Sequence, residues 1–418
     1  MIGIESGVMK KLIFVTYGGG HVAMLVPVIK KMLSFNCYNI VVIALTTAAS
    51  VLDREGIVYL GYKDFTDLAN DRWVSYGHEL LDTVLERSPL ISHEESLAYY
   101  GINFLELVES YGYESAFSLF KEKGRHAFFP IKFFEKVLSV LKPDLVVATS
   151  SPRSEMAAIQ AAGLLDIKSL CLVDMFALQE YQWLAKSAYA TKIGVLNCEV
   201  KDFLVSKGRA ESDIVVTGNP AFDRIFDKSL KVLADVLRED LLEQVPHKKI
   251  ILFASQIEPF KHPFEDVDGG DVFLPRKIEH ALREFVSNSE QYHLVVRYHP
   301  SENTKFEPAK NVSLSLKSDN LHVLIHAVDL VVVTASTVGL EAYLAGKPVI
   351  SVDNSIWTKD GPYSQMGISY GVPSVDALPN AIESIFQGNY AQKLDTGGEE
   401  MAVDRVVSLV MDLCKPPA

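Results

Sequence analysis

Short apolar segments alternate with helix-like segments along the chain, and this alternation restricts its fold more than any other feature. The strand-like runs are residues 11–17, 39–45, 144–149, 168–173, 192–196, 214–217, 249–254, 292–297, 328–333 and 348–352. The helix-like segments are 22–35, 153–163, 199–207, 276–288, 337–345 and 375–386. Strands that are apolar throughout and alternate with helices predict a parallel sheet covered on both faces.

A chain of 418 residues is too long for one ordinary hydrophobic core, so we expect two domains. The boundary is expected at Gly218-Asn219-Pro220, because strand 214–217 ends there and Pro220 prevents simple continuation. The fold class predicted is α/β, with two Rossmann-like, doubly wound domains that face each other across a cleft. Their expected bounds are 1–218, with a helical insertion at about 75–140; 219–395; and a C-terminal helix within 396–418 that packs back on the first domain.

A glycine-rich turn follows the first predicted strand. Gly18, Gly19 and Gly20 end that strand and lead directly into the first predicted helix. A helix start leaves backbone N–H groups unpaired beside the positive end of the helix dipole, which suits a phosphate or a developing anion. His21 adds a group that can accept a proton near neutral pH, so we predict that it is the catalytic base.

A second turn of this kind follows the strand at 328–333. Ser336 or Thr337 can cap the next helix and also offer a hydroxyl to a phosphate. Gly339 removes a side chain where a ligand approaches. Glu341 lies one turn further on, and a carboxylate can accept hydrogen bonds from both hydroxyls of a ribose. These residues predict a nucleotide site.

Other polar residues lie at the ends of predicted strands, where a parallel sheet places its ligands. Arg297 and His299 follow the strand at 292–297 and can both address an anion. Ser255 ends the first strand of the second domain, and Asn219 lies at the hinge, so both are candidates for the diphosphate. His322 and His326 have the i, i+4 spacing of a metal motif, but no third ligand is evident and we expect a core or surface pair.

Composition excludes several classes of function. The net charge of −13 argues against nucleic acid as a partner, and no apolar run reaches the length of a membrane span. The N-terminus does not resemble a signal peptide, and the four widely spaced cysteines suggest reduced thiols, so a cytoplasmic protein is expected. No metal or other cofactor is expected. Phenylalanines at 128, 129, 133 and 134 lie among basic residues and suit peripheral membrane contact or buried helix packing, of which we favour packing.

Together these motifs resemble the GT-B glycosyltransferase superfamily over most of the chain. The sequence from Tyr17 to His21 resembles the turn of the N-acetylglucosaminyltransferase that completes the lipid-linked peptidoglycan precursor. Val216-Thr217-Gly218-Asn219-Pro220 is similar to the interdomain sequence of that enzyme and of UDP-N-acetylglucosamine 2-epimerases. Residues 297–302 and 336–341 resemble motifs of capsule-type transferases that use cytidine-linked donors.

The resemblance implies a glycosyltransferase of bacterial-type cell-surface polysaccharide synthesis, located in the cytoplasm or at the inner face of the membrane. The second domain would hold a UDP- or CMP-linked sugar donor, with Glu341 on the ribose and Ser336, Thr337 and His299 on the phosphates. The first domain would bind a glycan or lipid-linked acceptor, and His21 would be its base. The sequence identifies neither the sugar nor the oligomeric state.

Two other classes stay open. A 2-epimerase or hydrolase would act on the nucleotide sugar alone and needs carboxylates near the sugar, for which Asp174, Glu155 and Glu180 are candidates by position. The chain departs from those epimerases at two turns, since they begin with a Gly-Thr-Arg-Pro-Glu type sequence and have a Ser-Gly-Gly type turn where this chain has Ala335-Ser336-Thr337. A binding module without catalysis is the third class.

Overall fold

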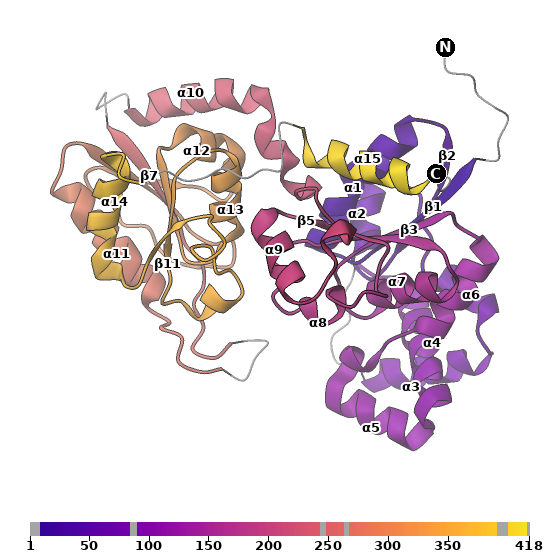
Figure 1. The fold of residues 1–418 in the computed structure, drawn as a ribbon. Helices are drawn as coiled ribbons and strands as arrows, with labels where there is room; N and C mark the ends of the chain where they lie inside the picture. The colour runs from indigo at the N-terminus through magenta and orange to yellow at the C-terminus, as the bar shows by residue number, and fades with distance from the viewer. Residues whose placement is uncertain (1–8, 84–89, 243–247, 263–266, 391–399, 416–418) are drawn as a thin grey trace, which may run out of the picture. The chain divides into compact units, whose positions relative to one another are not determined.

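The protein consists of two compact units, each built on a parallel sheet (Figure 1). The structure is a computed structural model and describes residues 9–83, 90–242, 248–262, 267–390 and 400–415. Unit 1 comprises Met1–Ala221 and Gly397–Ala418, and unit 2 comprises Phe222–Thr396. The predicted fold class, α/β with two parallel sheets, is confirmed.

The sheet of unit 1 has the strand order β2-β1-β3-β4-β5-β6, and all its strands are parallel. The strands are β1 Lys10–Thr16, β2 Tyr38–Ala44, β3 Leu145–Thr149, β4 Lys168–Leu172, β5 Lys192–Val195 and β6 Ile214–Val216. Phe14 on β1 is in register with Val42 on β2 and Val147 on β3. The strand order reverses direction between β1 and β3, which is where doubly wound sheets bind ligands.

Helices cover this sheet because its strands are apolar on both faces. They are α1 Gly20–Ser34, α2 Ala48–Arg54, α7 Ser154–Leu164, α8 Tyr181–Leu184, α9 Cys198–Ser206 and α15 Ala402–Leu413. The last of these is separated from the others by the whole of unit 2, yet its Val406 and Val410 join one core cluster with Leu25 and Ile29 of α1. Arg405 Nε donates to the Thr217 carbonyl at 3.0 Å, which ties α15 to the end of the sheet.

An insertion of helices follows β2 in unit 1. It contains η1 Tyr62–Leu68, α3 Arg72–Thr83, α4 His93–Tyr111, α5 Tyr113–Lys123, η2 Gly124–Ala127 and α6 Ile131–Leu141. Phe128, Phe133 and Phe134 are buried in it, and the Phe133 ring stacks on Tyr62 with centroids 4.8 Å apart. The prediction that these aromatic residues pack inside the protein is therefore confirmed for the three.

Unit 2 has the strand order β12-β11-β10-β7-β8-β9, again all parallel. Its strands are β7 Lys249–Ala254, β8 Tyr292–Arg297, β9 Val312–Ser315, β10 Leu330–Val333, β11 Val349–Val352 and β12 Tyr370–Val372. Its helices are α10 Lys228–Leu242, α11 Leu274–Ser287, α12 Leu321–Ala327, α13 Thr337–Leu344 and α14 Leu378–Phe386, with η5 Ile356–Lys359 and η6 Val375–Ala377; η4 Pro220–Phe226 leads into the unit. The order reverses between β7 and β10, so the switch point of this sheet lies there.

Helix α11 illustrates how the sequence determines the packing of unit 2. Leu274, Ile278, Leu282 and Val286 recur every four residues, so they form one buried stripe along the helix. This stripe packs in one cluster with Phe253 of β7 and with other strand residues.

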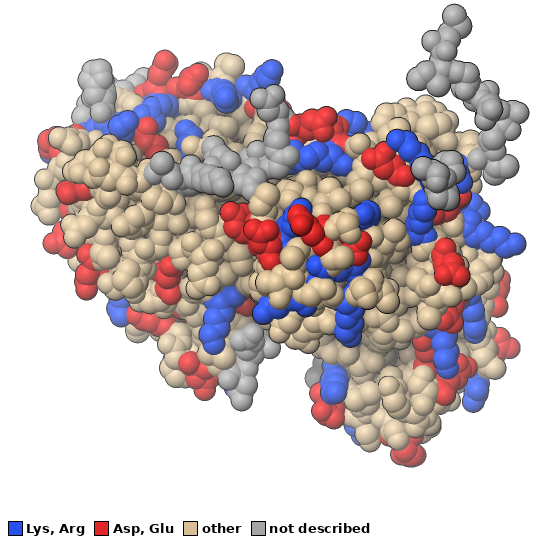
Figure 2. Space-filling view, viewed as in Figure 1, with Lys and Arg blue, Asp and Glu red and all other residues tan. Residues whose placement is uncertain are grey.

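The surface carries charges of both signs. Figure 2 shows Lys and Arg interspersed with Asp and Glu over the face in view. Within the described part of the chain, no helix combines the length and the apolar character that crossing a bilayer requires.

Candidate active site residues

The turn between β1 and α1 is built around three glycines. Gly18 cannot carry a side chain, because a β-carbon there would lie 1.9 Å from Thr47 Oγ1. Gly19 precedes α1 with a φ of +69°, a conformation that favours glycine. A β-carbon on Gly20 would meet no described atom within 4 Å, so the start of α1 is open at this point. His21 follows in the first turn of the helix and is partly exposed.

Two polar groups lie beside this turn, one at the end of strand β3 and one at the start of helix α7. Thr149 Oγ1 lies 2.7 Å from His21 Nδ1. Glu155, near the start of α7, is completely buried and accepts hydrogen bonds from Thr149 and from the backbone N–H of Tyr17. Burial raises the pKa of Glu155, whereas His21 and these donors lower it.

Two more carboxylates follow β4. Ser150 Oγ donates to Asp174 Oδ1 at 3.2 Å, which links the ends of β3 and β4. Burial raises the pKa of Glu180, and the negative charge of Asp174 raises it further, whereas His21 lowers it. His21 is hydrogen-bonded to Thr149 at the end of β3, and Asp174 is bonded to Ser150, the next residue, so both lie at the carboxyl edge of the unit 1 sheet. Glu180 follows Asp174 after β4, on the same edge.

Asn219 has a structural role that its sequence position did not reveal. Its side-chain amide donates to the Asp174 carbonyl at 2.8 Å, and its side-chain oxygen accepts from Ala221 N at 2.9 Å. Asn219 belongs to unit 1 and stabilises the turn after β6 beside Asp174. Contact with a nucleotide held by unit 2 stays a prediction for this residue.

The turn between β10 and α13 has the geometry of a capped helix start. Ser336 precedes α13, and its hydroxyl accepts from Val338 N at 3.4 Å. Thr337 is exposed at the first helical position. Gly339, by contrast, is buried, and a β-carbon there would lie 2.8 Å from Val333 Cγ2 and 2.9 Å from Tyr363 Cε2. The expectation that this glycine leaves room for a ligand is corrected: it leaves room for strand β10 and for Tyr363.

Glu341 lies one turn into α13 and pairs with a histidine of α12. His322 Nε2 is 2.8 Å from Glu341 Oε2, and the glutamate side chain is 13% exposed. His322 and His326 are spaced i, i+4 as in a metal motif, but each has its own partner. His326 Nε2 contacts the Ile225 carbonyl at 2.7 Å. A ribose at Glu341 would therefore share this carboxylate with His322.

The ends of β7 and β8 carry the other predicted phosphate ligands. Ser255 is buried, and its hydroxyl accepts from Arg276 at 2.8 Å. His299 Nδ1 accepts from the backbone N–H of Ser301 at 3.1 Å, so the proton of a neutral imidazole lies on Nε2.

The side chain of Arg297 is already engaged by other residues of unit 2. Its Nη1 donates to Ser315 Oγ at 2.8 Å and to the Leu316 carbonyl at 3.0 Å. Burial lowers the pKa of Arg297. An anion would have to compete with these contacts.

Sequence reasoning missed several residues at the carboxyl edge of unit 2. Gln256 Oε1 accepts from Thr334 Oγ1 at 3.0 Å and from Ala335 N at 3.2 Å, which joins the two strands at the switch point. His262 is buried and lies 2.7 Å from Asp360 Oδ2, with its ring 5.0 Å from that of Trp357. These hydrogen bonds join segments 78 to 98 residues apart, and no local motif indicates them.

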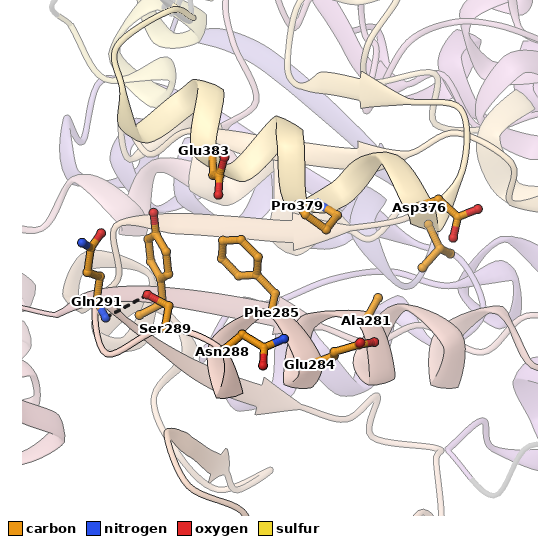
Figure 3. Close-up of a pocket in the computed structure, with 11 residues that line it drawn as sticks. Ala281, Glu284, Phe285, Asn288, Ser289, Gln291, Asp376, Pro379 and Glu383 are labelled. Atoms are coloured by element: carbon orange, nitrogen blue, oxygen red, sulfur yellow. Dashed lines mark hydrogen bonds between the residues drawn. The ribbon is translucent and has the colours of Figure 1, made fainter.

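A cavity of about 630 Å³ lies elsewhere in unit 2, between α11 and α14 (Figure 3). Phe285 and Pro379 form its apolar part, and Glu284, Asp376 and Glu383 give it an acidic rim. None of the residues predicted to bind a nucleotide lines it. In the described ranges, no group of three or more His, Cys, Asp or Glu is arranged to hold a metal ion.

Two doubly wound units on parallel sheets make this a GT-B protein, and the family match below makes it one that processes nucleotide sugars. The family model for UDP-N-acetylglucosamine 2-epimerase matches residues 130–360, more than half of the chain. The chain belongs to this family. A search of the curated proteins found no match.

Solved structures with the same fold include epimerases and a transferase. Staphylococcus aureus MnaA with UDP has a TM-score of 0.57 at 15% identity, covering 98% of this chain and 99% of that one. Neisseria meningitidis UDP-GlcNAc 2-epimerase bound to UDP-GlcNAc has a TM-score of 0.54 at 14% identity, covering 96% of this chain and 100% of that one. The calicheamicin glycosyltransferase CalG4 has a TM-score of 0.51 at 14% identity, covering 97% and 94%.

The predicted resemblance to the GT-B superfamily is confirmed, but the order of its branches changes. The sequence motifs favour a transferase and leave the epimerase as the alternative. The family match favours the epimerase branch.

Proposed function

We propose that this protein acts on a UDP-linked N-acetylhexosamine, inverting the configuration at C2 of the sugar or releasing the sugar from UDP. The observation that carries the proposal is that the hydrogen bonds of His21 to Thr149 and of Asp174 to the adjacent Ser150 bring an imidazole and a carboxylate to the carboxyl edge of unit 1, where Glu180 also follows β4. Membership of the 2-epimerase family supports the choice of substrate class.

The chemistry of inversion requires more than one proton-transfer group. A carbon that changes configuration loses its hydrogen from one face and regains a proton on the other, so a base and an acid must act on opposite sides. Burial and Asp174 raise the pKa of Glu180, which favours its protonated form and suits the acid. His21, at the open start of α1, suits the base.

The nucleotide is assigned to unit 2. The backbone N–H groups at the start of α13, together with Ser336 and Thr337, would receive the diphosphate, and His299 Nε2–H would donate to it. Glu341 would accept from the ribose hydroxyls. Charge that develops on the departing UDP would be stabilised by these donors without a metal ion.

A glycosyltransferase is the second candidate. The observation that favours it is the sequence from Tyr17 to His21, which resembles the turn of a peptidoglycan-precursor transferase. In this alternative His21 removes the proton from a hydroxyl of a glycan or lipid-linked acceptor, and no hydrogen on the sugar carbon is exchanged.

One incubation distinguishes the two. The full-length protein is mixed with UDP-GlcNAc in D₂O, with and without a mixture of acceptors, and NMR follows deuterium at C2 and free UDP. We expect deuterium at C2 or UDP release without an acceptor. Product that forms only when acceptors are present, with no deuterium at C2, would establish the transferase instead.

Variants test the individual roles. His21→Ala and Glu180→Gln are expected to lower turnover by roughly 10²–10⁴ while leaving UDP binding unchanged. Glu383→Gln is the matched control, because this carboxylate lies on the rim of the cavity between α11 and α14, which no predicted site residue lines. Turnover that persists in both site variants would contradict the assignment.

A further inference from the structure

Glu155 has no role in the chemistry described so far, although it is the most deeply placed carboxylate of the candidate site. It is 0% exposed and lies in the first turn of α7. A carboxylate is buried at a cost unless hydrogen-bond donors surround it. Here the donors lie at the carboxyl ends of the two strands that flank the switch point of unit 1: Tyr17 follows β1, and Thr149 ends β3.

Three donors converge on the two oxygens of Glu155. The backbone N–H of Tyr17 donates to Oε1 at 2.5 Å, and the backbone N–H of Thr149 donates to Oε2 at 2.6 Å. The hydroxyl of Thr149 also donates to Oε2. Burial raises the pKa of Glu155 overall, but the three hydrogen bonds that it accepts act in the opposite direction and favour the ionised carboxylate.

The third of these hydrogen bonds determines whether the Thr149 hydroxyl donates to His21 or accepts from it. A hydroxyl has one hydrogen, and that of Thr149 is given to Glu155. The other neighbour of Thr149 Oγ1 is His21 Nδ1, at 2.7 Å. At this separation the oxygen must accept, so Nδ1 of His21 must carry a hydrogen.

We propose that Glu155, acting through the hydroxyl of Thr149, holds His21 in the tautomer with its hydrogen on Nδ1 and leaves the lone pair of Nε2 free to take a proton from the substrate. This inference rests on the proposed function, because it takes His21 to be the catalytic base. Glu155 and Thr149 are positioning residues, because neither needs to contact the substrate.

The proton balance follows from the same geometry. As Nε2 takes the substrate proton, the imidazole becomes a cation that donates from both nitrogens, and the Nδ1–H···Oγ1 bond persists. Glu155 keeps its charge and stabilises that cation through Thr149, so no second proton has to move. His21 in turn lowers the pKa of Glu155, against the effect of burial.

The tautomer can be measured directly in the unliganded full-length protein. Labelling histidine with ¹⁵N and recording two-bond ¹⁵N–¹H correlations identifies the ring nitrogen that carries the hydrogen, and His21→Ala assigns the signal. We expect hydrogen on Nδ1 in the wild type. Hydrogen on Nε2 of His21 in the neutral wild-type protein would overturn the proposal.

Two variants of Thr149 separate positioning from packing. Thr149→Val keeps the shape of the side chain and removes the hydroxyl, so we expect His21 to lose the Nδ1–H form and kcat to fall by about 100-fold, with unchanged affinity for UDP. Thr149→Ser keeps the hydroxyl and should retain both the tautomer and most of the activity. A Thr149→Val variant that keeps the Nδ1–H tautomer would refute the role of the hydroxyl.

Glu155→Gln adds an independent measurement where it folds. Its amide group can donate to Thr149, which frees the hydroxyl hydrogen for His21 and should move the imidazole hydrogen to Nε2. The NMR readout does not depend on activity. Full activity in His21→Ala would refute the proposed function, whatever the tautomer of His21. An inactive His21→Ala together with hydrogen on Nε2 in the wild type would refute only the role of Glu155 and Thr149.

Discussion

Individual glycines of the two candidate turns have different physical roles, although the sequence presents them alike. Gly20 faces open space at the start of α1, whereas Gly339 is enclosed by β10 and Tyr363. Tyr363 is itself buried, and its hydroxyl donates to the Ser336 carbonyl at 2.8 Å. A side chain at position 339 would therefore disturb both the packing of α13 and the turn that carries Ser336.

This contrast predicts opposite effects of the same substitution on stability. Gly339→Ala should lower the free energy of unfolding by about 1–3 kcal/mol, since its β-carbon would lie 2.8 Å from Val333. Gly20→Ala should leave stability unchanged or raise it by up to about 1 kcal/mol, because alanine favours the helix and meets no described atom. Urea unfolding of the two variants measures both. Equal stability of the two proteins would contradict the packing role of Gly339.

Among the elements, most strands could be predicted from the sequence, including the three-residue edge strand β6, but the two edge strands of unit 2 could not. The ten predicted strand runs correspond to ten of the strands observed. Strands β9 and β12, at the two edges of the unit 2 sheet, span only four and three residues and were missed. An edge strand has a neighbour on one side alone, so its sequence needs no long apolar run. Helix α10 was missed as well, because few of its residues are buried.

The candidate site divides in the same way. Residues in or just after the turn that follows a strand, such as His21, Ser255 and Ser336, could be located from the sequence because the end of a parallel strand fixes the position of that turn. Contacts between distant segments could not, as in the pair of Glu341 with His322. The burial of Glu155 beneath the glycine turn also depends on such a contact, since 138 residues separate it from Tyr17.

The half-buried His293, which links β8 to the edge strand β9, predicts that stability depends on pH. His293 on β8 contacts Ser313 Oγ on β9 at 2.9 Å, and burial, together with Lys248, lowers the pKa of His293 below its ordinary value of 6.5. A lowered folded-state pKa means that stability present above pH 6.5 is lost as the pH falls through that lower value. His293→Gln should therefore show a smaller drop in melting temperature between pH 7 and pH 5 than the wild type. An identical drop in both proteins would show that His293 does not contribute.

At the scale of the whole molecule, the chain returns to unit 1 after completing unit 2. Helix α15 supplies Val406 and Val410 to the core beside α1, and Lys168 Nζ on β4 donates to the Leu413 carbonyl at 2.8 Å. The fold of unit 1 therefore depends on a segment that follows unit 2 in the chain. Unit 2 has its own core and includes no residue of α15.

This arrangement predicts that a change in α15 destabilises unit 1 selectively. Val410 is fully buried, so Val410→Ala should cost unit 1 about 2 kcal/mol, whereas Met411→Ala, at a side chain 39% exposed, should change stability by less than about 0.5 kcal/mol. The three tryptophans allow each unit to be followed by its own fluorescence, since Trp73 and Trp183 lie in unit 1 and Trp357 lies in unit 2.

The measurement uses two backgrounds of the full-length chain. In Trp357→Phe, urea unfolding reports unit 1, and Val410→Ala should shift its midpoint to lower urea concentration. In Trp73→Phe/Trp183→Phe, the same substitution should leave the midpoint of unit 2 in place, because Val410 packs in the core of unit 1 and not in that of unit 2. If both midpoints move together by the same amount, the two units unfold as one cooperative block and α15 stabilises the whole chain, contrary to this prediction.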